Sequence, residues 1–195
     1  MAAERKPRLF TPEEYLLLEE QAEQKSEYFD GEIFAMAGGL PEHNQIAGNA
    51  LIALGAQLKG LPCRGYVNDL RLNVRKNGLY TYPGLMIICG DNELLAGRID
   101  TVTNPVLILE VLSKSTRDYD QGEKFRMYRA IPSLRHYLVV EQKAVWVVHH
   151  KKTDANNWIT EEYDGLTDVI AINPPGLQLP LADLYEKITF KQDYE

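Results

Sequence analysis

The chain has 195 residues, of which 45% are hydrophobic and 25% are charged, and its net charge is −7 at pH 7. This length and composition suit one globular domain and exclude a disordered chain. No segment approaches the roughly 18 uninterrupted apolar residues that cross a bilayer. We therefore expect no membrane segment and a cytoplasmic protein, with an N-terminal tail over residues 1–10 and a single domain over residues 11–190.

Positive charge is unevenly spread along the chain. Residues 59–76 carry five basic side chains against one acidic side chain, and residues 114–135 carry six against three. The net negative charge argues mildly against a protein that coats nucleic acid, because Lys and Arg supply most of the non-specific affinity for phosphate. The two basic stretches either form a DNA-facing surface or are solvated faces of the fold.

The start of the sequence predicts a helix, a hairpin and a second helix. Thr11 supplies a capping hydroxyl, a proline follows it and Glu14 lies three residues after it, so a helix should run from here to about Lys25. Asp30-Gly31 separates two short apolar runs, as in a two-residue hairpin. Apolar residues then recur at helical spacing over residues 42–59.

The rest of the chain reads as strands around one further helix. The run over residues 105–112 is nearly continuous and aliphatic, as in a central strand buried on both faces, yet it contains Glu110. These elements predict an α/β (α+β) architecture with a mixed central β-sheet flanked by helices. Strands are expected over residues 63–67, 69–75, 79–89, 105–112, 135–140 and 145–150, helices over residues 117–130 and 181–187, and a hairpin over residues 158–172.

The cysteines and the adjacent histidines favour no metal site. Cys63 and Cys89 lie in no CxxC pair and near no histidine, so we expect reduced, mostly buried thiols rather than a zinc site or a disulfide. His149 and His150 should point to opposite faces of a strand and cannot easily bind one metal ion, so we expect both at the surface. His43, at the start of the second helix, has no nucleophile motif beside it.

Three positions could together support phosphodiester chemistry. They are the strand end around residues 80–84, Glu110 on the apolar strand, and Lys124 on the following helix. Hydrolysis of a phosphodiester requires carboxylates that hold a divalent ion, water polarised by that ion, and a cation that offsets the developing charge. A carboxylate in an apolar strand is expensive unless it is paired, so Glu110 serves either such a site or a structural ion pair.

A series of motifs in order resembles the Uma-two family of the PD-(D/E)XK nuclease superfamily. The resemblance extends from about Thr11 to Tyr185 and implies a restriction-endonuclease-like fold. It also implies DNA cleavage that depends on Mg²⁺ or Mn²⁺. The motifs lie at residues 26–33 (SEYFDGEI), 42–44 (EHN), 68–71 (NDLR), 80–83 (YTYP), 105–113 (PVLILEVLS), 119–125 (YDQGEKF) and 133–137 (SLRHY).

The sequence departs from the family pattern at two positions. Gly84 stands where the resemblance implies a metal-binding aspartate, which leaves Glu110 as the main ligand unless Asp69 or Glu32 fills the gap. Leu112 stands where the motif would have its lysine, and the resemblance implies that Lys124 takes that role. Without the family pattern, Lys124 reads as a solvated helix residue and Asp69 as a turn residue.

These observations lead to three functional hypotheses. The first is a metal-dependent DNA endonuclease with Glu110 and Lys124 as catalytic residues, impaired by Gly84. The alternative is a catalytically inactive protein of the same fold that binds nucleic acid or protein. The third is a homo-oligomeric structural or regulatory protein whose exposed sheet edge pairs across a two-fold axis, although a nuclease could also form a homodimer in this way. Candidate DNA contacts are Arg71, Arg75, Lys114 and Arg117.

Overall fold

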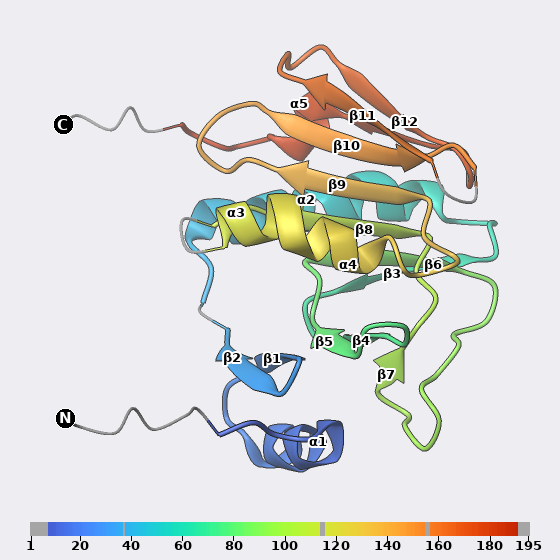
Figure 1. The fold of residues 1–195 in the computed structure, drawn as a ribbon. Coiled ribbons are helices and arrows are strands. Elements are labelled where there is room, and N and C mark those ends of the chain that lie inside the picture. The colour runs from blue at the N-terminus through green and yellow to red at the C-terminus, as the bar shows by residue number, and fades with distance from the viewer. Residues whose placement is uncertain (1–7, 37, 114–115, 155–156, 191–195) are drawn as a thin grey trace, which may run out of the picture.

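Two β-sheets form the body of the protein (Figure 1). The computed structural model describes residues 8–36, 38–113, 116–154 and 157–190. The larger sheet runs in the order β11 (Trp158–Tyr163), β10 (Val147–Lys152), β9 (His136–Val140), β8 (Leu107–Val111), β6 (Leu85–Cys89) and β3 (Cys63–Val67). The smaller sheet runs in the order β2 (Glu32–Ala35), β1 (Ser26–Phe29), β5 (Leu79–Thr81), β4 (Arg71–Val74) and β7 (Thr101–Val102). β8 and β9 are parallel within a largely antiparallel sheet, so the predicted mixed α/β (α+β) sheet is confirmed.

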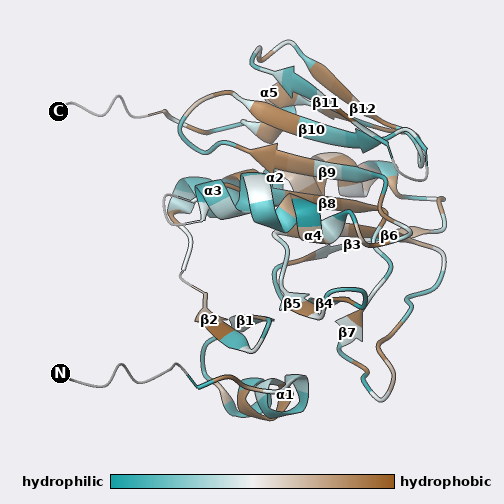
Figure 2. Cartoon of the chain, in the orientation of Figure 1, coloured by the Kyte–Doolittle hydropathy of each residue, from teal (hydrophilic) through white to brown (hydrophobic). Residues whose placement is uncertain are grey.

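Helices cover both faces of the larger sheet. α2 (Pro41–Gln57), α5 (Leu181–Leu184) and the β12 (Val169–Ile172) and β13 (Leu177–Pro180) hairpin share one apolar core with that sheet. The other core is formed against a helix that begins as α3 (Arg117–Tyr119), continues as a π-helical turn over Asp120–Lys124 and ends as α4 (Phe125–Tyr128). The apolar central strands and the polar outer side of this helix are visible in Figure 2.

Strand alternation decides which residues of β8 face which helix. Leu107 and Leu109 belong to the core under α2, whereas Ile108 belongs to the core under α4. Because side chains alternate along a strand, Glu110 lies on the same face as Ile108, toward α4. The central strand therefore directs its one carboxylate at the helix that carries Lys124.

The predicted first helix and first hairpin are confirmed, although the helix ends at Gln21 rather than near Lys25. Thr11 accepts a hydrogen bond from the Glu14 amide and Glu14 accepts one from the Thr11 amide, which is a complete capping box for α1 (Pro12–Gln21). Asp30 and Gly31 both have positive φ, at 48° and 88°, as a tight hairpin turn between β1 and β2 requires. No helix in the described part of the chain has the length and apolar character needed to cross a membrane.

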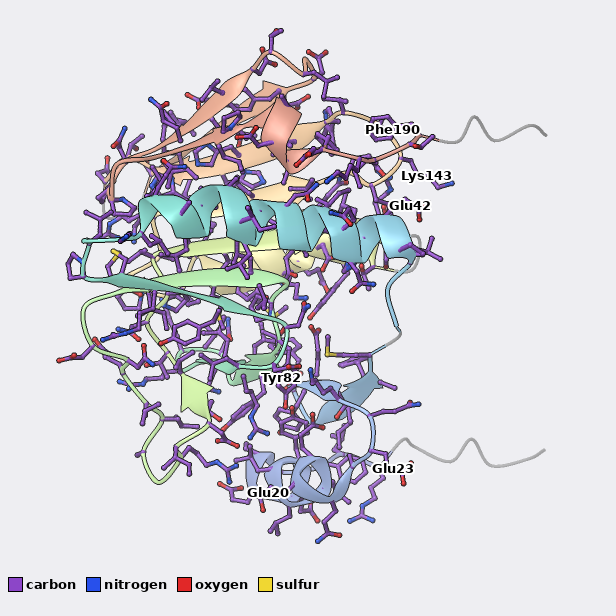
Figure 3. All side chains as sticks on the ribbon, turned by 180° about the vertical axis from the view of Figure 1, so that it is seen from behind. Glu20, Glu23, Glu42, Tyr82, Lys143 and Phe190 are labelled. Carbon is purple, nitrogen blue, oxygen red and sulfur yellow. A yellow bond between two sulfur atoms is a disulfide. The ribbon has the colours of Figure 1, made fainter. Side chains whose placement is uncertain are left out.

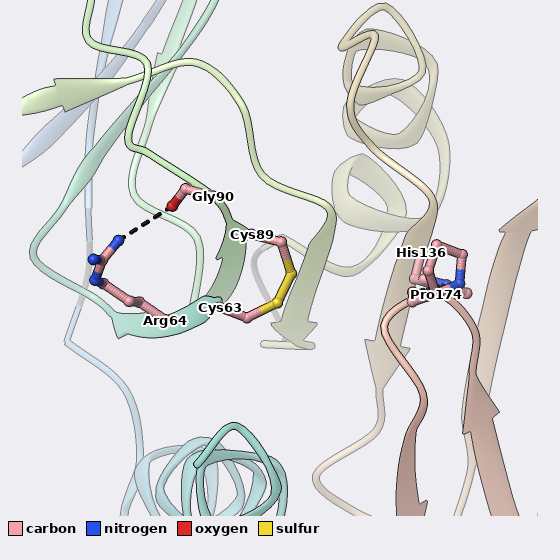
Figure 4. The surroundings of a disulfide bond; sticks show 6 residues. All are labelled: Cys63, Arg64, Cys89, Gly90, His136 and Pro174. Atoms are coloured by element: carbon pink, nitrogen blue, oxygen red, sulfur yellow. Dashed lines mark hydrogen bonds between the residues drawn. A yellow bond between two sulfur atoms is a disulfide. The ribbon is translucent and has the colours of Figure 1, made fainter. Parts of the chain in front are cut away.

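Two predictions about the fold are wrong. Residues 158–172 do not form one hairpin, because β11 joins the larger sheet beside β10 while β12 pairs with β13. Cys63 and Cys89 are not free thiols but form a disulfide (Figure 4). They are direct cross-strand partners in β3 and β6, a juxtaposition that the 26-residue separation in sequence does not reveal.

The prediction of a surface position is also wrong for His149, which is fully buried. One ring nitrogen of His136 lies 3.0 Å from the Pro174 carbonyl oxygen, and its other ring nitrogen lies 2.9 Å from Nε2 of His149. Since a carbonyl only accepts, His136 donates to Pro174 and therefore accepts from His149. Burial lowers the pKa of both rings, so both are neutral at pH 7 within this chain of hydrogen bonds.

We expect this histidine pair to make the fold less stable in mild acid. Burial lowers the pKa of His136 to about 4 and that of His149 to about 3. The unfolded chain takes up protons first, so each histidine's contribution is full above pH 6.5 and falls as the pH drops toward 4. From pH 7 to pH 5 the loss should be about 2 kcal/mol for each histidine. Urea unfolding of the native protein and of His149→Gln at both pH values would check this, because the variant should lose less. An equal loss in both would contradict it.

Candidate active site

A cavity of about 550 Å³ opens where the two sheets meet. Its lining comes from the β1–β2 hairpin, the start of α2, the beginning of β6, the end of β8 and the helix after it. Tyr82, which Figure 3 places between α1 and the larger sheet, also lines it and donates a hydrogen bond to Glu19 of α1. The charged or titratable groups on the wall are Glu27, His43, Tyr82, Glu110, Tyr119, Asp120 and Lys124.

One ammonium group faces three carboxylates at the base of this cavity. Nζ of Lys124 lies 2.9 Å from Oε1 of Glu27, 3.1 Å from Oε1 of Glu110 and 3.3 Å from Oδ1 of Asp120. All four side chains are buried or nearly so, with exposed fractions between 5% and 11%. The cluster therefore combines low solvent access with an excess of acidic groups.

Glu110 is held by groups from two other segments. Its Oε2 accepts a hydrogen bond of 3.1 Å from the amide of Gly84, and its Oε1 accepts one of 2.9 Å from the hydroxyl of Tyr128. Burial raises the pKa of Glu110, Lys124 opposes that rise, and Asp120 and Glu27 reinforce it. The carboxylate is fixed in orientation while part of its ordinary acidity is lost.

The same carboxylates act in the opposite direction on Lys124. Burial alone would lower its pKa, but Glu110 and the neighbouring Tyr128, Glu27 and Asp120 raise it well above the ordinary value. Lys124 therefore carries its proton at neutral pH, and its charge is what makes the burial of these carboxylates tolerable.

The π-helical turn brings a carboxylate and an ammonium group of the helix to the cavity. Asp120 and Lys124 are its first and last residues, are four positions apart and are both buried. Single π-turns inside α-helices are frequent at functional sites because the extra residue redirects side chains. Oδ1 of Asp120 is buried and, among the described residues, has the ion pair with Lys124 but no well-directed hydrogen bond.

Gly84 leaves a space next to Glu110. A Cβ atom at this position would lie 3.8 Å from Oε2 of Glu110 and 3.2 Å from the carbonyl oxygen of Leu109. A carboxylate carried there would therefore adjoin that of Glu110. In this chain position 84 offers only its backbone amide, which already donates to Glu110.

The structure brings together Glu110, Lys124 and Gly84, but not the other two residues predicted near the metal. Asp69 is 83% exposed and pairs with Lys25 at the surface. Glu32 is exposed on the edge strand β2, and neither residue lines the cavity. Glu27, five residues before Glu32, occupies the position beside Lys124 instead.

The predicted DNA-contacting residues are scattered. Arg71 is buried in an ion pair with a half-exposed carboxylate, which makes it part of the framework of the smaller sheet. Arg75 is exposed and donates to a backbone carbonyl. Arg117 is half-exposed and pairs with Glu141, while Lys114 lies outside the described residues.

Sequence reasoning missed Glu27 and Asp120 as cavity residues, and it favoured a helix-start role for His43 while the family match left a place at the rim of the site open. Strand alternation around the predicted hairpin, and the four-residue spacing between Asp120 and Lys124, were available signals for the first two. His43 lines the cavity with its Nδ1 buried and unpaired in the described structure. Burial lowers its pKa, against an opposing hydrogen bond with the Val111 backbone.

Comparison with known proteins identifies the family. Residues 12–182 match the Uma2 family, described as putative restriction endonuclease. The uncharacterized Synechocystis protein sll1609 is 36% identical over 158 residues, covering 81% of this chain and 89% of that protein. A second uncharacterized Synechocystis protein, slr1290, is 34% identical over 180 residues, covering 92% and 93%.

A solved structure shares the fold. The crystal structure of a putative nuclease belonging to DUF820 from Anabaena variabilis superposes with a TM-score of 0.75 at 16% identity, over 92% of this chain and 99% of that one. At this identity the likeness concerns the fold. The mixed sheet, the flanking helices and the family match together show that this chain belongs to the Uma2 family and has a restriction-endonuclease-like fold.

Proposed function

We propose that the protein is a DNA endonuclease that requires Mg²⁺ or Mn²⁺ and is weakened by Gly84. The observation that carries this proposal is the buried cluster in which three carboxylates face a single ammonium at the wall of a cavity. Membership of the nuclease family supports phosphodiester hydrolysis as the reaction. Glu110 and Lys124 are the proposed catalytic residues, as in the sequence hypothesis.

The negative charge of the three carboxylates around Lys124 suits a divalent cation. Three carboxylates surround one ammonium, and within the described structure Oδ1 of Asp120 has only its ion pair with Lys124, 3.3 Å away. Within residues 8–36, 38–113, 116–154 and 157–190, however, no three Asp, Glu, His or Cys side chains already form a metal-ligand group. Glu110, with Glu27 and Asp120 in place of the predicted Asp69 and Glu32, would hold the ion.

The bound ion would polarise a water molecule and offset charge on the phosphate. The chain's own groups have separate tasks in this proposal. The Gly84 amide and the Tyr128 hydroxyl fix the two oxygens of Glu110, so that its orientation is set before any ligand arrives. Lys124, held in its charged form, would donate to the attacking water or to a phosphate oxygen.

The alternative function is a non-cleaving nucleic-acid or protein-binding module. It is favoured by a specific observation, namely that Lys124 already stands between all three carboxylates and that position 84 supplies no fourth. If this arrangement is permanent, the cavity retains the shape of a nuclease site without its metal. The two functions differ in metal binding and cleavage, so one experiment separates them.

We expect native protein to nick supercoiled plasmid slowly in Mn²⁺, and Glu110→Gln to abolish nicking. The substitution keeps the side-chain size but removes the charge that would bind the ion, so the rate should fall by about 10²-fold or more. Calorimetric titration with Mn²⁺ should show heat for the native protein and none for the variant. Glu32→Gln, an exposed position on β2, is the matched control and should behave as native. Absence of both Mn²⁺ binding and nicking in the native protein would select the non-cleaving module.

A further inference from the structure

A row of basic and aromatic side chains crosses three neighbouring strands outside the cavity. Lys152 of β10 is the direct partner of Trp158 of β11, and its amide donates to the carbonyl of Arg135, which precedes β9. Cross-strand partners present their side chains on the same face of a sheet. The next row on that face holds Tyr137, His150 and Thr160.

The end of the helix adds an aromatic ring and a further cation to this face. Phe125 stacks on His150 with ring centroids 3.8 Å apart and meets Trp158 edge-on at 5.4 Å. The guanidinium of Arg129 lies 5.6 Å from the Phe125 ring centre, and Nζ of Lys152 lies 5.9 Å from the Trp158 ring centre. Figure 1 shows β10 and β11 extending beyond the helix on this side.

The cations of this face form no ion pair within the described part of the chain. Among the described residues, no carboxylate lies within ion-pair distance of Arg129, Arg135 or Lys152. The guanidinium of Arg135 donates to backbone carbonyls. Burial and Arg135 both lower the pKa of Lys152, against the pull of Asp154, so like charges are held close together. Binding of an anion therefore stabilises this group of cations.

The face is joined to the candidate active site through one helix. Lys124 points into the cavity, and the next residue, Phe125, packs on the outer face. Arg129 follows five residues after Lys124, about 7.5 Å along the axis at the helical rise of 1.5 Å per residue. The helix that places Lys124 in the cavity therefore also places Phe125 and Arg129 on the outer face.

We propose that Arg129, Arg135 and Lys152 bind the phosphate backbone of DNA, with Trp158 against the same strand. Arg and Lys contacts to phosphate hold a protein on DNA without reading its sequence, and an aromatic ring among such cations stacks on bases that are unpaired. The inference rests on the proposed function for the choice of DNA as the polyanion. It assigns the DNA surface to residues 125–158 rather than to the basic stretch over residues 59–76.

The test is fluorescence anisotropy with a labelled 20-base-pair duplex, in EDTA, over a range of salt concentrations. The triple variant Arg129→Gln/Arg135→Gln/Lys152→Gln should bind at least about 30-fold more weakly than the native protein. The slope of log Kd against the logarithm of the salt concentration should be smaller in magnitude by about 2.7, because each of the three lost phosphate contacts contributes about 0.9 to the slope. The control triple Lys59→Gln/Arg64→Gln/Arg75→Gln removes the same charge from exposed positions of the other stretch and should change Kd only a few-fold.

A second readout follows Trp158 directly. The chain has two tryptophans, so in a Trp146→Phe background the emission reports on Trp158 alone. DNA should change this emission, since Lys152 stands over the ring and a phosphate would draw it away. Equal loss of binding in the two triples, or an unchanged salt slope in the first, would overturn the proposal. EDTA removes any metal, so these measurements of binding do not depend on cleavage. They can therefore be interpreted even if the endonuclease proposal fails.

Discussion

Replacing Gly84 by Asp is expected to tighten Mn²⁺ binding by about 10²-fold and to raise plasmid nicking with it. The new carboxylate would adjoin Glu110, since a Cβ at position 84 lies 3.8 Å from Oε2 of that residue. Opposite unit charges about 4 Å apart gain about 4 kcal/mol near a protein surface, and a tenfold affinity change needs about 1.4 kcal/mol. The backbone at this position has no positive φ, so the substitution needs only a shift of a few tenths of an ångström at Leu109.

Gly84→Asn is the control for this prediction, because it has the same size and no charge. Calorimetry with Mn²⁺ would compare the two variants, and thermal unfolding with and without Mn²⁺ gives a second measure that does not depend on turnover. Without metal, Gly84→Asp should be the less stable variant, since a fourth carboxylate then faces one ammonium. If the Asp and Asn variants bind Mn²⁺ equally, the side chain at position 84 does not contact the metal and the proposed ligand set is wrong.

Replacing Lys124 by Met should destabilise the fold by about 3–5 kcal/mol at pH 7.5. The substitution preserves much of the side-chain volume but leaves Glu27, Glu110 and Asp120 buried without their shared cation. Urea unfolding would measure the loss. The deficit should narrow as the pH falls, because a protonated carboxyl carries no charge to bury, and burial already raises the pKa of Glu110.

Lys25→Met is the matched control for Lys124→Met. It removes an ammonium from a pair with Asp69 in which the two side chains are 41% and 83% exposed. Surface pairs of this kind contribute about 0–1 kcal/mol. Similar losses in the two variants would mean that the Lys124 charge does not compensate the buried carboxylates, and the electrostatic account of the site would fail.

The sequence predicts the scaffold of the site better than its ligands. Capping and turn residues set α1 and the first hairpin, and a continuous aliphatic run sets β8, because these signals act within a few residues of each other. The resemblance paired Glu110 with Lys124 across two elements. The break at Pro83-Gly84 was also visible, and it is where the chain passes from β5 of one sheet to β6 of the other.

What failed depends on contacts between distant segments. Glu27 and Glu32 both belong to the first hairpin, and only the docking of that hairpin against the larger sheet decides which of them meets Lys124. The Cys63–Cys89 disulfide depends on the register between β3 and β6, and the buried ring of His149 pairs with that of His136, whose other ring nitrogen contacts Pro174, 38 positions later in the chain. Local patterns carry no information about such long-range pairings.

The separation in sequence between Glu27 and Lys124 determines when, during synthesis of the chain, the charged cluster can form. The two residues are 97 positions apart, so during synthesis the glutamate is made long before its counter-ion. Through that interval its carboxylate remains in water, and no shorter product that ends before residue 124 can complete the cluster. The charged cluster that makes the cavity a candidate active site therefore forms only after Lys124 has been made. A chain truncated before that residue lacks the cluster.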